Sequence, residues 1–157
     1  MDRRIVGFVM DPAGAWVAQL DCFHCQHVRH APPFRSAPWV MDDVARAARV
    51  GATLNCPLCD RAELPDGLEV VRTTDTWDEA TMPAGLRRAH RVAVGTWGRL
   101  RVDAGELRFR ARTEPPLDVV VDARAAQPIP PGVEHEVEPC GPVRFFVEFL
   151  RPPPAAE

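Results

Sequence analysis

Two pairs of cysteines, each with two residues between them, constrain this chain more than any other feature. Cys22 and Cys25 lie in the stretch 22–30, which also carries three histidines, and Cys56 and Cys59 follow about thirty residues later. Zn²⁺ accepts four tetrahedral nitrogen or sulfur ligands, and a two-residue gap lets both thiolates of a pair reach one ion. The spacing therefore predicts a structural zinc site, and spacing alone favours these four cysteines as its ligands.

The composition excludes several classes of protein. With 46% hydrophobic and 26% charged residues, the 157-residue chain is globular in composition and has room for one ordinary domain or two small ones. Its net charge of −3 favours no nucleic-acid partner, and no apolar run approaches the ~20 residues of a membrane span. Residues 1–10 lack the apolar core of a secretory signal, so we expect a cytoplasmic protein. In that reducing compartment five cysteines favour metal ligation over disulfides.

The first 66 residues predict a small module. Strands at 5–10 and 15–20 form a hairpin that leads into Cys22, and an acidic start predicts a short helix over 42–51. A segment of this size buries only about 60% of its unfolded surface. Structural zinc contributes roughly 10–16 kcal/mol of apparent binding free energy in finger peptides, and only to the folded state. Metal binding would therefore explain how a module over 1–66 folds.

From residue 67 onward the pattern changes to repeated short strands. Residues 106–112 alternate between apolar and arginine side chains, which is the period-2 pattern of a half-buried strand with a solvated arginine face. Regularly spaced short strands are typical of a sandwich or small barrel. The expected strands are 68–73, 86–94, 97–102, 106–112, 117–121, 133–137 and 143–150. We therefore expect a mainly β protein: a zinc-stabilised hairpin and helix module over 1–66, then a barrel domain over 67–157.

A second set of candidate ligands lies on the expected strands of the barrel. His135 shares a face with Val133 and Val137, and His90 is likewise in phase with neighbouring valines, so both imidazoles are expected to point inward. With the carboxylate of Glu148 they would form a two-histidine, one-carboxylate set, which suits Fe²⁺, Mn²⁺ or Zn²⁺ with open positions. The alternative interpretation is hydrogen-bonded structural histidines and a Glu148 that pairs with an arginine.

Residues 7–60 resemble a small family of uncharacterised bacterial proteins. The shared motifs are G-F-x-x-D, W-V-A-x-L, C-x-H-x-Q-H-V-R-H, P-W-V and C-P-L-C, and all are present. In that pattern the position of Cys25 is not usually a cysteine. The resemblance therefore favours His24 as the fourth zinc ligand, beside Cys22 and the second cysteine pair, with Cys25 as the alternative.

Residues 74–151 resemble the TehB/YeaR-like cupin domain, which is associated with tellurite resistance and implies a double-stranded β-helix barrel. The likeness is carried by Trp77 and the stretches 81–86, 88–90, 95–98, 105–107, 131–135 and 143–149. Residues 130–135 fit P-x-G-x-x-H, one half of the cupin signature. The other half normally offers H-x-H with a downstream Glu, of which only His90 stands, so the resemblance implies a depleted metal site.

Three functions are compatible with these patterns. The first is a two-module metal-binding protein of the tellurite, oxyanion or related stress response, with a small-molecule or oxyanion ligand and without its own methyltransferase domain. The second is an enzyme in which His90, His135 and Glu148 hold a divalent metal as Lewis acid or redox centre. The third makes the zinc module an interaction or regulatory adaptor. A homodimer is compatible with the cupin resemblance, although the sequence shows no interface signal.

Overall fold

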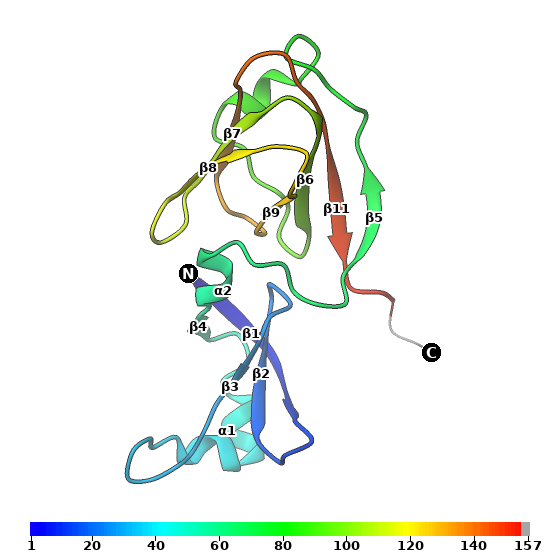
Figure 1. Ribbon diagram of the computed structural model, residues 1–157. Coiled ribbons are helices and arrows are strands. Elements are labelled where there is room, and N and C mark those ends of the chain that lie inside the picture. The colour runs from blue at the N-terminus through cyan, green and yellow to red at the C-terminus, as the bar shows by residue number, and fades with distance from the viewer. Residues whose placement is uncertain (155–157) are drawn as a thin grey trace. The chain divides into compact units, whose positions relative to one another are not determined.

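A computed structural model describes residues 1–154 of the protein, and Figure 1 shows its ribbon with most of the helices and strands labelled. The chain divides into two compact units, Met1–Cys56 and Pro57–Glu157. The division falls inside the second cysteine pair, and the functional boundary expected after residue 66 stays a prediction. None of the helices among the described residues is long and apolar enough to cross a bilayer. The protein is mainly β, as expected.

The first unit contains a four-stranded antiparallel sheet with the order β3-β2-β1-β4. Its strands are β1 (Asp2–Met10), β2 (Trp16–Leu20), β3 (Cys25–His27) and β4 (Thr53–Asn55). The expected hairpin is confirmed as β1 and β2, and its turn is held by the carboxylate of Asp11, which accepts the N–H groups of Ala13 and Ala15 at 2.9 and 2.8 Å. Strands β3 and β4 were not predicted, because strands of three residues are too short to show a period.

The expected helix over 42–51 is present but shorter. After a 3-10 turn η1 (Pro38–Met41), α1 covers Asp43–Ala47, and the carboxylate of Asp42 caps it by accepting the N–H of Ala45 at 2.7 Å. Arg46 of α1 is buried because its guanidinium lies 3.5 Å from the ring centroid of Trp16 and donates to the carbonyl oxygen of Val40 at 2.6 Å. These contacts attach α1 to the sheet.

The second unit contains two antiparallel sheets with the orders β10-β7-β8 and β5-β11-β6-β9. Six of the seven expected strands are confirmed, and β9 was missed. The elements are α2 (Pro57–Asp60), β5 (Glu69–Thr73), η2 (Ala84–Arg87), β6 (Trp97–Ala104), β7 (Leu107–Ala111), β8 (Leu117–Val121), β9 (Gln127–Ile129), β10 (His135–Pro139) and β11 (Arg144–Arg151). The alternating side chains of β6, β7 and β11 form the core, with Trp97, Leu100, Phe109 and Phe145 fully buried.

The expected strand over 86–94 was wrong. Pro83 directly precedes a 3-10 turn, η2, and the chain then runs without a strand partner to Trp97. One isolated bridge joins His90 to His135, with N–H to O distances of 2.9 Å in both directions. His90 and Val94 are both exposed, whereas Val92 between them is buried, so the inward face expected for these three residues is not formed. The alternation of side chains over 86–94 does not produce a strand, because no neighbouring strand pairs with this segment.

Candidate metal centre and cavity

The thiols of Cys22, Cys56 and Cys59 and the imidazole of His24 form a buried cluster. Their ligand atoms all lie within 4.8 Å of one another, and this is the one such group of three or more Cys, His, Asp or Glu residues found among residues 1–154. The Nδ1 atom of His24 lies 3.5 Å from the Sγ of Cys22 and 3.4 Å from the Sγ of Cys56, and the two sulfurs are 3.9 Å apart. The cluster could therefore hold a metal ion.

A tight turn after β2 brings Cys22 and His24 to this cluster. Phe23 has a φ of +69°, in the left-handed region, while the N–H of Leu20 donates to the carbonyl oxygen of His24 at 3.0 Å. The side chain of His24 consequently turns inward, and Cys25 begins β3 with an exposed side chain. The structure thus brings His24 to the cluster and leaves Cys25 outside it.

The second cysteine pair is delivered by β4 and a single helical turn. Asp2 of β1 is paired with Asn55 of β4, and the N–H of Cys56 donates to the carbonyl oxygen of Met1 at 2.7 Å. Pro57 then opens α2, a position where its missing N–H costs nothing. Cys59 lies within this turn and is fully buried.

The spacing of the cluster fits the geometry of a tetrahedral zinc site. Bond lengths of ≈ 2.3 Å for Zn–S and ≈ 2.0–2.1 Å for Zn–N give tetrahedral edges of about 3.8 Å between sulfurs and about 3.6 Å between sulfur and nitrogen. The three separations among Cys22, His24 and Cys56 are each within a few tenths of an ångström of these edges. Three thiolates and one imidazole are also the soft and borderline donors that Zn²⁺ accepts.

The electrostatics of the cluster favour a positive charge at its centre. Burial acts to lower the pKa of His24, but hydrogen bonds to Cys22 and Cys56, with the charge of their thiolates, outweigh it and raise that pKa to about 9. A divalent cation bound by a neutral His24 would supply the same positive charge.

The other polar residues of the stretch 22–30 have structural partners. The Nε2 atom of His27 lies 2.8 Å from the Oδ2 of Asp11, and Nδ1 of His30 accepts the N–H of Ala37 at 3.0 Å. The amide of Gln26 donates to the carbonyl oxygen of Asn55 at 2.9 Å. These contacts hold the chain around the cluster. The ligand atoms of the cluster come from Cys22, His24, Cys56 and Cys59.

The second unit contains a cavity of about 450 Å³, lined from both of its sheets and from η2. Its inner wall is apolar and includes Leu100 of β6, Ile129 of β9, Val137 of β10 and Val147 of β11. The polar groups at the cavity are His90, His135, Arg72, Thr73, Thr74 and Asp75. Neither Arg72 nor Asp75 could be identified from the sequence, because β5 shows no apolar alternation and Asp75 follows the end of that strand.

His135 occupies the wall of this cavity. Its side chain is buried between Val133 and Val137, as the alternation predicted, and its ring stacks on Phe109 with centroids 5.7 Å apart. Nδ1 lies 3.0 Å from the carbonyl oxygen of Val133, and burial, followed by the nearby His90, lowers the pKa of His135 against the effect of that hydrogen bond. The ring of His90 lies edge-on to it at a centroid distance of 5.4 Å.

Glu148 lies away from the two histidines. It alternates on β11 with Val147 and Phe149, which line the cavity, and Glu148 is not among the lining residues. Its carboxylate accepts from the Nε of Arg99 on β6 at 2.6 Å. Glu148 therefore pairs with an arginine, which was the alternative expectation. Successive side chains of β11 point to opposite faces of the sheet, so Glu148 points away from the cavity that Val147 and Phe149 line.

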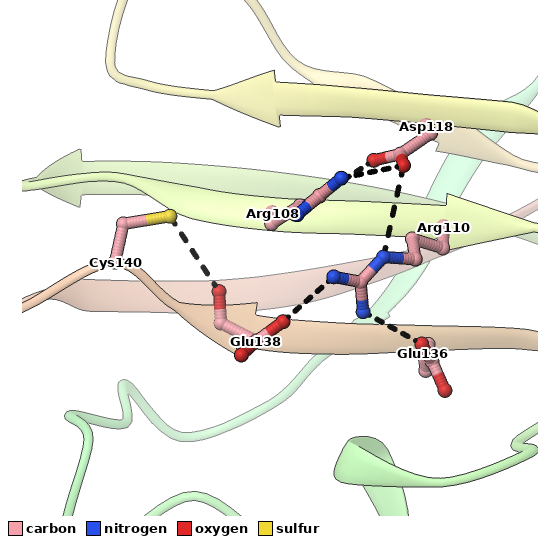
Figure 2. Close-up of polar contacts among 6 residues, drawn as sticks. All are labelled: Arg108, Arg110, Asp118, Glu136, Glu138 and Cys140. Carbon is pink, nitrogen blue, oxygen red and sulfur yellow. Dashed lines mark hydrogen bonds and ion pairs between the residues drawn. The ribbon is translucent and has the colours of Figure 1, made fainter.

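The arginine face of β7 forms an ion-pair network across the three-stranded sheet (Figure 2). The guanidinium of Arg108 binds both oxygens of Asp118 at 2.8 Å, and that of Arg110 binds Glu136 at 2.8 Å and Glu138 at 2.9 Å. These hydrogen bonds lower the pKa of Asp118 and raise the pKa values of both arginines. The expected solvated face is confirmed, and each of these arginines is paired with a carboxylate of a neighbouring strand.

Two family models match the chain. The model described as a protein of unknown function, DUF3565, matches residues 6–63, and the model of the TehB-like domain matches residues 72–147. The second unit resembles TehB. A comparison with curated proteins found no match.

Two solved structures are similar to about half of the chain. TehB from Haemophilus influenzae has a TM-score of 0.50 and 23% identity, over 55% of this chain and 32% of that one. A crystal structure of a protein from E. coli strain K12 has a TM-score of 0.51 and 23% identity, over 57% of this chain and 96% of that one. These likenesses describe the fold. Because the match spans only 32% of TehB, the expected absence of a methyltransferase domain stays a prediction.

Proposed function

We propose that this protein is a cytoplasmic, two-module metal-binding protein of the tellurite, oxyanion or related stress response. Its N-terminal module holds a structural zinc ion, and its TehB-like domain is a cupin-type barrel that binds a small ligand in the cavity. The observation that carries the proposal is the buried cluster of Cys22, His24, Cys56 and Cys59, with separations close to tetrahedral edges.

A structural role for the zinc follows from the closed donor set. Four protein ligands fill the tetrahedron and leave no position for water or substrate, as in structural zinc sites. All four side chains are buried, so the ion would be shielded from exchange with solvent. Cys25 is exposed and serves as the matched residue that should not bind the metal.

The ligand-binding role of the second module is supported by the cavity and by its polar groups. Two facing sheets and a histidine in the P-x-G-x-x-H stretch, residues 130–135, are what a cupin barrel requires. The cavity of about 450 Å³ falls within the range of small-molecule sites. The stress-response role is supported by the likeness to the TehB-like domain.

Elemental analysis of the full chain, purified without chelator or affinity metal, tests the zinc assignment. We expect about one zinc per chain, lost in Cys56→Ser and His24→Ala and retained in Cys25→Ser. Loss of zinc in Cys25→Ser with retention in His24→Ala would reverse the choice of fourth ligand. Absence of zinc from the unmodified protein would refute the site.

A growth assay tests the stress role. Expression of the full chain in a tellurite-sensitive bacterium should raise the tellurite concentration that stops growth, and Val147→Phe, which narrows the cavity, should remove the effect. Glu148→Gln lies on the other face of β11 and is the control. Equal protection against tellurite by Val147→Phe and Glu148→Gln would show that the cavity has no part in this protection.

A further inference from the structure

The interior of the cavity is poorly suited to an oxyanion. Leu100, Ile129 and Val137 are each at most 2% exposed and line its inner wall. An oxyanion moved from water into such surroundings loses its hydration, and only several converging donors could replace it. The inner wall offers apolar surface instead, which favours a ligand with an apolar body.

Besides two histidines and two threonines, the rim carries one positive and one negative side chain, Arg72 and Asp75. The guanidinium of Arg72 lies 4.5 Å from the ring centroid of Phe149. Asp75 also lines the cavity, so one negative charge accompanies the positive charge of Arg72. An anion would be attracted to one of these side chains and repelled by the other. The rings of Trp77 and Phe149 at the same cavity can pack against a flat ligand.

His135 specifies the polar group that a ligand must carry. A carbonyl oxygen only accepts hydrogen bonds, so the contact of Nδ1 with the oxygen of Val133 requires the proton to be on Nδ1. In this tautomer Nε2 carries no proton and can accept a hydrogen bond. No hydrogen bond to this Nε2 is found within the described part of the chain. A bound molecule can therefore complete the site by donating a hydrogen bond from a hydroxyl group.

We propose that the cavity binds a small, largely apolar organic molecule, with a ring of phenolic size, whose hydroxyl group donates to Nε2 of His135. The tellurite oxyanion is then not the ligand of this cavity. The inference rests on the proposed function only in taking the cavity as the ligand site, and it names the chemical class of the ligand.

Matched probes test the inference on the full, zinc-loaded chain. We would titrate 4-ethylphenol, ethylbenzene and sodium tellurite by calorimetry against the unmodified protein. We expect 4-ethylphenol to bind about tenfold more tightly than ethylbenzene, as one net hydrogen bond predicts. In His135→Asn, whose amide can still donate to Val133, that ratio should fall to about one. Val147→Phe should weaken both probes, and Glu148→Gln should change neither.

An independent readout does not depend on whether the His135 variant folds. In the unmodified protein, the ¹⁵N resonance of His135 Nε2 should move toward the hydrogen-bonded position when 4-ethylphenol is added and stay in place with ethylbenzene. Equal affinity of the two probes, or an unmoved resonance at saturation, would overturn the inference. Tellurite that binds and displaces 4-ethylphenol would overturn it as well and leave the proposed ligand site standing. Failure of every probe to bind would overturn both.

Discussion

Removal of the metal from the first unit is the perturbation with the largest expected effect. Cys56→Ser replaces a buried sulfur ligand of the cluster by a hydroxyl group, which is a poor zinc ligand at neutral pH. We expect this variant to lose the fold of residues 1–56 while the sheets of residues 69–151 persist.

The structure supports this expectation through the size of the first unit's core. Its fully or nearly fully buried large aliphatic side chains are Ile5, Val17, Leu20 and Val40. At about 1.5–3 kcal/mol each, four such side chains contribute about 6–12 kcal/mol. Structural zinc contributes roughly 10–16 kcal/mol of apparent binding free energy in finger peptides, as much as that whole aliphatic core. A unit that loses the larger of two such terms should not stay folded.

The assay is a ¹H–¹⁵N spectrum of the full chain, recorded for the unmodified protein, Cys56→Ser and the control Cys25→Ser. In Cys56→Ser, amide resonances of β1 and β2 should collapse to unfolded positions, whereas those of β6 and β11 should remain dispersed. Cys25→Ser should leave both sets in place. A Cys56→Ser spectrum that keeps dispersed β1 and β2 resonances without bound zinc would refute the reasoning, because the aliphatic core would then suffice.

Two further predictions concern the second unit. Burial lowers the pKa of His135 in the folded state, so the unfolded chain takes up a proton at this residue first as pH falls. The contribution of His135 to the free energy of unfolding is therefore complete above pH ~6.5 and is lost as pH falls through the folded-state pKa. Urea unfolding at about pH 7.5 and about pH 5.5 should show a smaller loss in His135→Gln than in the unmodified protein, and equal losses would contradict this sign. Gly105 has a φ of +77°, and a Cβ there would lie 2.2 Å from the carbonyl oxygen of Pro142, whereas Gly67 has a φ of +76° and open space. Gly67→Ala should cost about 1–2 kcal/mol in unfolding free energy and Gly105→Ala clearly more, and equal costs would show that the clash is relieved.

Strand phase could be predicted wherever a strand has both a partner and a buried face. The alternation over 106–112 predicted the inward face of β7 and its arginine face correctly, because the sheet buries one side of this strand. Residues 86–94 show the same alternation and form no strand, since no neighbouring strand pairs with them. Pairing is a property of the fold and cannot be read from one segment.

The spacing of Cys22, Cys25, Cys56 and Cys59 by itself determined that a metal site was to be expected, since the reach of a thiolate across two residues is a local property. The tertiary structure decided which side chains meet. The left-handed backbone at Phe23 turns His24 inward and leaves Cys25 at the start of an exposed strand. In the second unit, the pleat of β11 directs Glu148 toward Arg99 and away from His135. In both cases the outcome depends on the direction in which one residue's side chain points relative to distant strands. The spacing of residues along the sequence carries no information about that direction.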